Sequence, residues 1–180
     1  MIPAPFEYQR VESVDHAIQV LSDEPEAKIL AGGHSLLPLM RVRLARPSFL
    51  VDISRIQDLK YVKEDGDQVA IGALTRHHDV ANSEVLHELC PIVAYAAGEI
   101  GDPQVRHVGT IGGSVAHADP ASALPSVLLA LDAEMVVRGP EGSVRNIPAG
   151  DFFKGLFEPD LASNEVLTEI RVPRTADRGW

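Results

Sequence analysis

Two glycine pairs place the strongest constraint on how this 180-residue chain can fold. The first lies in Ala31-Gly32-Gly33-His34-Ser35, and the second lies in Thr110-Ile111-Gly112-Gly113-Ser114. Each pair borders an apolar run and is closed by a serine. Glycine lets the backbone adopt positive φ and lets another group approach without meeting a Cβ atom. The two segments therefore predict backbone N–H groups that surround an anion, such as a ligand with two phosphates held from both sides.

The residues around the first pair predict a β-strand, a helix and a second β-strand. An apolar run at residues 27–31 reads as a buried strand that leads into the glycines. Residues 36–44 have helical spacing, with Pro38 tolerated in the first turn, and residues 49–53 again read as a strand. This order is that of a βαβ unit. Upstream, Ser13 is a plausible cap for a helix that begins at Val14.

The rest of the chain predicts hairpins and helices. A strand pair flanks Gly66-Asp67, a long helix is interrupted by Pro91, and a second hairpin turns at Pro140-Glu141-Gly142. The polar stretch from Gly101 to Ser122 has no sustained apolar period. One βαβ unit combined with several hairpins favours an α+β fold. The expected strands cover residues 59–63, 68–72, 134–138, 143–147 and 166–172, and the expected helices cover 85–99 and 126–131.

Composition excludes several classes of protein. The formal net charge of −10 argues against a nucleic-acid partner, which needs clustered lysine and arginine. No apolar run approaches the roughly 20 residues of a membrane helix, and no secretory signal is visible, so we expect a cytoplasmic protein. Cys90 is the single cysteine. It can neither form an internal disulfide nor hold an iron–sulfur cluster, and it reads as a buried structural thiol.

Commoner nucleotide and catalytic motifs are missing from the sequence. The first pair lacks the Gly-Lys-Ser/Thr ending of a P-loop and the Gly-x-Gly-x-x-Gly of a Rossmann site. A lone glycine pair is more often a plain tight turn, and the second pair is what favours a ligand. His77 and His78 belong to no metal-binding pattern, and we expect no metal site. Arg41, Arg43 and Arg46 could pair with phosphate, face solvent or contact a subunit.

Taken together, these segments resemble a known family. The stretch Ala31–Met40, combined with Asp102-Pro103-Gln104-Val105-Arg106 and residues 109–114, is similar to the FAD-binding medium subunit of molybdenum hydroxylases, the xanthine dehydrogenase family. Within that family the pattern is most similar to the medium subunits of aerobic carbon monoxide dehydrogenases. The resemblance covers residues 2 to about 174, and it implies a two-lobed FAD-binding domain of the PCMH (vanillyl-alcohol-oxidase-like) type.

The resemblance also implies which residues touch FAD. The two glycine segments would wrap the pyrophosphate, Leu167 would lie beside the flavin ring, and Asp119 would continue along the cofactor. No catalytic residue and no metal ligand is implied. The implied FAD-binding residues are Leu30, Ala31, Gly32, Gly33, His34, Ser35, Leu36, Gly109, Thr110, Ile111, Gly112, Gly113, Ser114, Asp119 and Leu167.

The family further implies an oxidoreductase role within a complex of the carbon monoxide dehydrogenase or the xanthine and aldehyde dehydrogenase type. Electrons would arrive from [2Fe-2S] clusters on a small subunit, supplied by a molybdenum cofactor on a large subunit, and leave for an external acceptor. The implied assembly is a dimer of heterotrimers. We expect an N-terminal lobe at 1–58, a second lobe at 59–174 and a truncated linker or tail at 175–180.

Two features depart from the family pattern. Ala123 stands where the family usually has an acidic residue that hydrogen-bonds the cofactor, and the family's C-terminal domain is absent from these 180 residues. Two alternative functions therefore stay open. One is a free-standing FAD-dependent oxidase or dehydrogenase, and the other is a fragment that no longer binds FAD.

Overall fold

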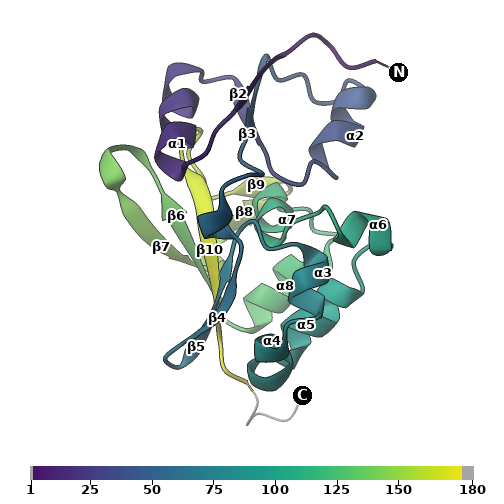
Figure 1. Ribbon diagram of the computed structural model, residues 1–180, viewed down its shortest axis with the longest axis vertical. Helices are drawn as coiled ribbons and strands as arrows, with labels where there is room; N and C mark the ends of the chain where they lie inside the picture. The colour runs from purple at the N-terminus through teal and green to yellow at the C-terminus, as the bar shows by residue number, and fades with distance from the viewer. Residues whose placement is uncertain (1, 176–180) are drawn as a thin grey trace.

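The computed structural model describes residues 2–175, and its N-terminal part is built around a small parallel sheet (Figure 1). The predicted tail at 175–180 lies outside the described residues, apart from Thr175. Strand β3 is central in the sheet order β1-β3-β2, and both of its neighbours run parallel to it. The elements of this part are β1 (Glu7–Arg10), α1 (Val14–Asp23), β2 (Ala27–Leu30), α2 (Leu36–Arg41) and β3 (Phe49–Asp52).

This part confirms the βαβ prediction. Strands β2 and β3 pair in parallel across α2, and the Ser13 side chain accepts from the backbone N–H of His16 to cap α1. Helix α2 ends at Arg41, three residues before the predicted end at Leu44. The sequence analysis missed β1 because this strand is largely exposed and has no apolar run.

The second part is a five-stranded antiparallel sheet with order β4-β5-β10-β6-β7, covered by helices. Strand β10 (Val166–Pro173) lies at its centre between β5 and β6. The preceding elements are η1 (Gln57–Leu59), β4 (Val62–Asp65), β5 (Gln68–Gly72), α3 (His77–Ala81), α4 (Glu84–Leu89), α5 (Pro91–Gly98), α6 (Pro103–Arg106), α7 (Ile111–His117), α8 (Ala123–Ala130), β6 (Glu134–Arg138), η2 (Pro140–Gly142), β7 (Val144–Pro148), α9 (Ala149–Phe152), β8 (Phe153–Gly155) and β9 (Glu158–Pro159).

Two predictions about this part are wrong in detail, and one stretch without a prediction contains helices. The helix expected at 85–99 is two helices, because Pro91 lacks an N–H and begins α5 instead of continuing α4. The first hairpin strand begins at Val62, since Leu59 belongs to η1. The stretch from Gly101 to Ser122 contains α6 and α7. These helices are too short for an apolar period to develop.

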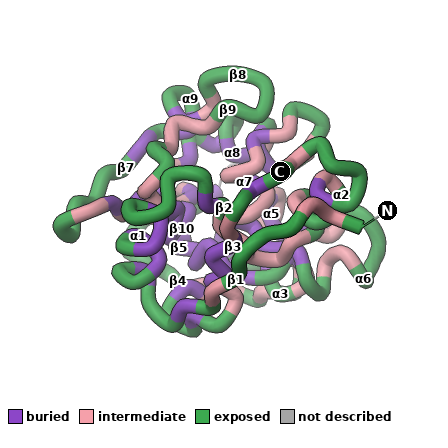
Figure 2. Tube along the Cα trace, turned by 90° about the horizontal axis from the view of Figure 1, so that it is seen from above, coloured by how far each residue is buried: buried purple, intermediate pink, exposed green. Residues whose placement is uncertain are grey.

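The buried residues, which are purple in Figure 2, form two clusters, and the second draws side chains from both parts. One cluster of buried side chains fills the space between the five-stranded sheet and its helices, and it includes Cys90, as predicted. A second cluster lies around α1 and the parallel sheet. Leu74 and Val166, which belong to the second part by sequence, are buried in this second cluster. The parallel sheet and α1 therefore pack against the N-terminal end of β10.

Candidate functional site

The first glycine segment is a turn whose backbone donors are free. Gly33 has a φ of +73°, a conformation that L side chains avoid, and this turn leads directly into α2. Among the described residues, none of the N–H groups from Gly32 to Leu36 donates to a protein acceptor. Neighbouring backbone amides that are free of protein acceptors can bind an anion such as a phosphate.

The second glycine segment differs, because the protein itself uses its donors. The N–H groups of Ile111 and Gly112 donate to the carbonyl oxygens of Thr75 (3.0 Å) and Ala73 (2.9 Å). The N–H of Gly113 donates to the Thr110 hydroxyl at 3.2 Å. The N–H of Ser114 also donates, to the Thr110 carbonyl at 3.1 Å, so the expectation that this pair presents free N–H groups is wrong for residues 111–114. The segment is the first turn of α7, and its hydrogen bonds anchor that helix to the end of β5.

Close packing explains why glycines occur in both segments. A Cβ on Gly32 would lie 2.4 Å from the carbonyl oxygen of Val108 and 2.8 Å from the Cα of Gly109. A Cβ on Gly112 would lie 2.5 Å from the Cβ of Ala73. Gly113 also faces Ala31: a Cβ added to Gly113 would lie 3.8 Å from the Cβ of Ala31. The tertiary structure thus brings the two predicted segments into direct backbone contact.

A buried histidine lies beneath this contact. The His77 side chain is 3% exposed, and its ring atoms Cδ2 and Nε2 would lie 3.0 and 3.3 Å from a Cβ on Gly109. Its backbone N–H donates to the Gly109 carbonyl at 3.0 Å. Burial, together with the nearby His34, lowers the pKa of His77 to about 4, so the ring is neutral near pH 7. The sequence analysis considered His77 only as a metal ligand and missed this position.

The polar side chains of the first segment are exposed. His34 lies with its Nδ1 atom 3.2 Å from the carbonyl oxygen of Gly32. Ser35 immediately precedes α2, and its hydroxyl makes no capping hydrogen bond to that helix. Both side chains can therefore reach a ligand that lies over the free N–H groups. Leu30 and Leu36 flank the turn and are half-buried.

The remaining predicted residues lie farther along α7 and β10. The Ser114 hydroxyl is 3.2 Å from the Ser122 hydroxyl, and the Asp119 carboxylate accepts from the N–H of Ala121 within its own turn. No hydrogen bond among the described residues joins Asp119 to either glycine segment. Leu167 is 5% exposed in β10 and is followed by a register shift before Glu169. This bulge is connected to α7 through Ala73. The Thr168 carbonyl accepts from the N–H of Ala73, and the Ala73 carbonyl accepts from the N–H of Gly112 in α7.

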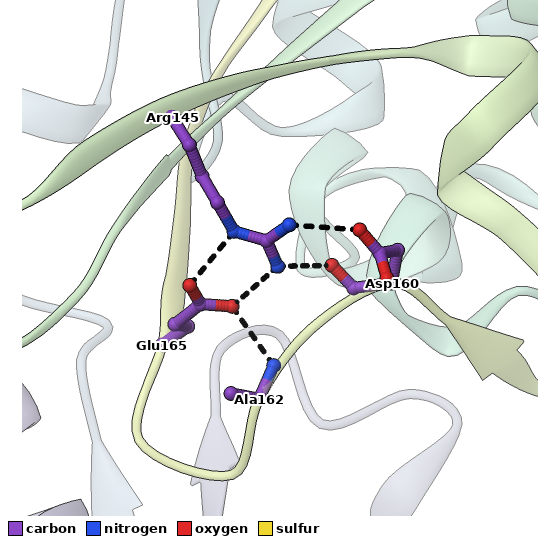
Figure 3. A network of polar contacts seen from close by, with 4 residues as sticks. All are labelled: Arg145, Asp160, Ala162 and Glu165. Carbon is purple, nitrogen blue, oxygen red and sulfur yellow. Dashed lines mark hydrogen bonds and ion pairs between the residues drawn. The ribbon is translucent and has the colours of Figure 1, made fainter.

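The loop that leads into β10 is held by a polar network that the sequence analysis did not identify (Figure 3). Arg145 on β7 donates from Nε and Nη2 to the two carboxylate oxygens of Glu165, at 2.8 and 2.7 Å. It also donates from Nη1 to the carboxylate of Asp160 and from Nη2 to the Asp160 carbonyl. The N–H of Ala162 completes the network on Glu165. These contacts fix the residues that immediately precede Leu167.

The site as a whole is suited to holding an extended anion. Its donors are backbone amides, glycines and leucines flank them, and the buried His77, whose pKa is strongly lowered, lies beside the backbone of Gly109. In the part of the chain that the structure describes, no three metal-ligating side chains gather in one place. No described helix is both long and apolar enough to cross a bilayer. The fold and the site together define a domain that binds a phosphate-bearing ligand.

Comparison with known proteins identifies the ligand class. Residues 4–175 match the family described as "FAD binding domain in molybdopterin dehydrogenase". The chain is 46% identical to the carbon monoxide dehydrogenase medium chain of Hydrogenophaga pseudoflava, over 100% of this chain and 63% of that protein. It is 43% identical to the glyceraldehyde dehydrogenase medium chain of Sulfolobus acidocaldarius, over 96% of this chain and 61% of that protein.

Solved structures agree with these relatives. Carbon monoxide dehydrogenase from Hydrogenophaga pseudoflava superposes with a TM-score of 0.94 over 97% of this chain and 61% of that one, at 46% identity. UDP-N-acetylenolpyruvylglucosamine reductase from Thermus caldophilus shares the fold alone, with a TM-score of 0.58 at 16% identity. The chain belongs to the family of FAD-binding domains of molybdopterin dehydrogenases, whose cofactor is FAD. It spans about three-fifths of the length of the curated relatives it matches.

Proposed function

We propose that this chain is the FAD-binding part of an electron-transfer subunit in a molybdenum hydroxylase. The observation that carries the proposal is the run of free N–H groups from Gly32 to Leu36, in contact with the second glycine segment. Neutral amides can hold a diphosphate without added positive charge, which suits a chain with a net charge of −10. The residues present therefore fit the pyrophosphate of FAD.

The proposed contacts with FAD are shared between the two lobes, 1–58 and 59–174. From the first lobe, residues 30–36 would donate N–H groups and the Ser35 hydroxyl. From the second lobe, residues 109–114 would line the opposite side of the pyrophosphate, mainly through backbone atoms that lie close to it. Asp119 and Leu167 would contact the cofactor beyond the pyrophosphate.

The chain's own residues would bind and position the cofactor. When bound, the flavin supplies the capacity to exchange electrons singly or in pairs. The free N–H groups would orient its diphosphate, and the contact of Gly32 with Gly109 fixes the separation of the two segments. Leu167, which is buried in the core of the five-stranded sheet, would lie beside the flavin ring. Neutral His77 supports the backbone of Gly109 without adding charge beneath the site.

The partners belong to the same proposal. We propose that a small iron–sulfur subunit delivers electrons from a large molybdenum subunit, and that the flavin passes them to an external acceptor. The single cysteine supports this division, because a cluster usually takes four thiolates. A dimer of heterotrimers and a cytoplasmic location are further parts of this proposal.

Titration with FAD tests the central claim. The purified chain should bind FAD, and Gly32→Ala should weaken binding at least about tenfold because its new methyl group would lie 2.4 Å from the Val108 carbonyl oxygen. Gly150→Ala is the matched control, since no atom lies within 4 Å of an added Cβ there. Flavin fluorescence reports binding, and thermal unfolding checks that both variants fold. A wild-type chain that binds no FAD would contradict the proposal.

A further inference from the structure

The two glycine segments offer a ligand free backbone donors on one side only. The N–H groups of residues 111–114 all donate to protein acceptors, whereas those of residues 32–36 are free among the described residues. Neither segment contains a lysine or an arginine, and the chain as a whole has a formal net charge of −10. A diphosphate between the segments would therefore lack a donor on the side of the second one. A cationic side chain there would supply it and offset the negative charge of the protein.

Arg76 lies directly opposite the second glycine segment. It forms an isolated antiparallel bridge with Thr110. Backbone hydrogen bonds between the chain neighbours of these two residues enclose the bridge on either side, both at 3.0 Å. In a pair of this kind, which shares no hydrogen bond of its own, the two side chains project from the same face and lie close together. The Arg76 side chain therefore begins beside the side chain of Thr110.

The first glycine segment approaches this same face. A Cβ added to Gly113 would lie 2.8 Å from the Thr110 hydroxyl oxygen and 3.8 Å from the Cβ of Ala31. Ala31 immediately precedes the free amides of residues 32–36. Figure 1 shows the same arrangement at the scale of elements, because α3, which follows Arg76, and α7 lie below the part that carries α2. Arg76 is thus the neighbour of Thr110 at the place where the two segments meet.

The guanidinium group of Arg76 has no ion pair in the described part of the protein. The residue is exposed, and no carboxylate among residues 2–175 pairs with it. Its backbone begins α3, but its side chain makes no capping hydrogen bond to that helix. Arg106 differs, because its Nη1 atom donates to the carbonyls of Ile100 (3.0 Å) and Gly101 (3.3 Å). Folding therefore uses Arg106 and leaves the Arg76 side chain available.

We propose that Arg76 is a further ligand-binding residue, whose guanidinium group donates to the phosphate oxygens of FAD from the side of the second glycine segment. This inference rests on the proposed function and adds to it a contact that depends on charge. Arginine donates through two nitrogens in one plane, a geometry that matches two oxygens of a phosphate. Neutral amides then hold the diphosphate on one side, and a single cation holds it on the other.

Titration of the purified chain with FAD, followed by flavin fluorescence, tests the inference. At about 0.01 M salt, Arg76→Gln should raise the Kd about tenfold, because it removes a charge-assisted hydrogen bond. Arg76→Lys should raise the Kd by a smaller factor, since lysine keeps the charge but loses the planar contact through two nitrogens. Raising the salt to about 0.1 M should weaken binding more in wild type than in Arg76→Gln, because salt screens the contact that only wild type has.

Lys63→Gln is the matched control, because it removes one positive charge from an exposed position in β4. Its Kd should stay within about twofold of the wild-type value at both salt concentrations. Thermal unfolding separates binding from folding. Because the Arg76 side chain makes no ion pair or capping contact among the described residues, all variants should melt at the wild-type temperature.

Two outcomes would overturn the inference and leave the proposed function standing. One is a wild-type Kd in Arg76→Gln, which would assign the side chain to solvent. The other is a raised Kd with the salt dependence of wild type, which would mean that the substitution acts through shape and not through charge. A wild-type chain that binds no FAD would overturn the proposed function and this inference with it.

Discussion

At the scale of single residues, the two glycine pairs perform different tasks. Gly33 supplies a backbone conformation with positive φ, whereas Gly32 and Gly112 supply room for close packing against Val108 and Ala73. Only the first segment keeps its N–H groups free of protein acceptors among the described residues. A substitution in the second segment should therefore mainly change the position of α7, and it should affect ligand binding only indirectly.

His77 makes stability depend on pH. The pKa of an unperturbed histidine is about 6.5, and burial together with the nearby His34 lowers the pKa of His77 to about 4 in the folded protein. The unfolded chain therefore binds the additional proton between pH 6.5 and 4, and the folded protein loses stability as the pH falls through this range. The full loss is about 3 kcal/mol.

We expect His77→Gln to flatten this part of the pH profile, because glutamine does not titrate. Its free energy of unfolding at pH 7 should be lower than that of wild type, since glutamine does not reproduce the packing of the ring against Gly109. Urea unfolding at a series of pH values measures both effects. His16→Gln, at an exposed position, is the control. An unchanged slope in His77→Gln would show that other groups cause the acid sensitivity.

At the scale of elements, local signals predicted most of the strands and the helices α1, α2 and α8, but not β1, α6 or α7. The Ser13 side chain caps α1 by accepting from one of its free N–H groups. Pro91 begins α5 because a residue in the first turn needs no N–H. Helices α6 and α7 escaped prediction because four and seven residues are too few for an apolar stripe. Helix α7 is held instead by hydrogen bonds to Ala73 and Thr75, which are distant in sequence.

The loop before β10 depends on the geometry of one guanidinium group. Arg145→Lys keeps the charge but cannot donate to Glu165 through two nitrogens and to Asp160 at the same time. We expect the free energy of unfolding to fall by about 1–2 kcal/mol and amide exchange at 160–165 to increase. Hydrogen-exchange mass spectrometry measures the second effect. Lys28→Arg, at an exposed residue in β2, is a control for changes of cation. Unchanged exchange at 160–165 in Arg145→Lys would refute this role.

At the scale of the whole molecule, the two sheets are expected to unfold together. Val166 begins the central strand of the antiparallel sheet, yet its side chain is buried in the core around α1. We expect Val166→Ala to lower the free energy of unfolding by about 2 kcal/mol while leaving a single transition. Val144→Ala, at a residue that is 58% exposed, should change it by less than about 0.5 kcal/mol. Two separate transitions in the wild-type chain would contradict a shared core.

The sequence by itself determined the βαβ unit, the hairpins, the α+β class and the family, because these depend on local periodicity, turn residues and two recognisable glycine segments. Only the tertiary structure decided that the segments touch through Gly32 and Gly109, that the protein uses the donors of the second one, and that His77 lies beneath them. These facts depend on contacts between residues far apart in the chain. Local spacing carries no information about which distant carbonyl a given N–H will reach.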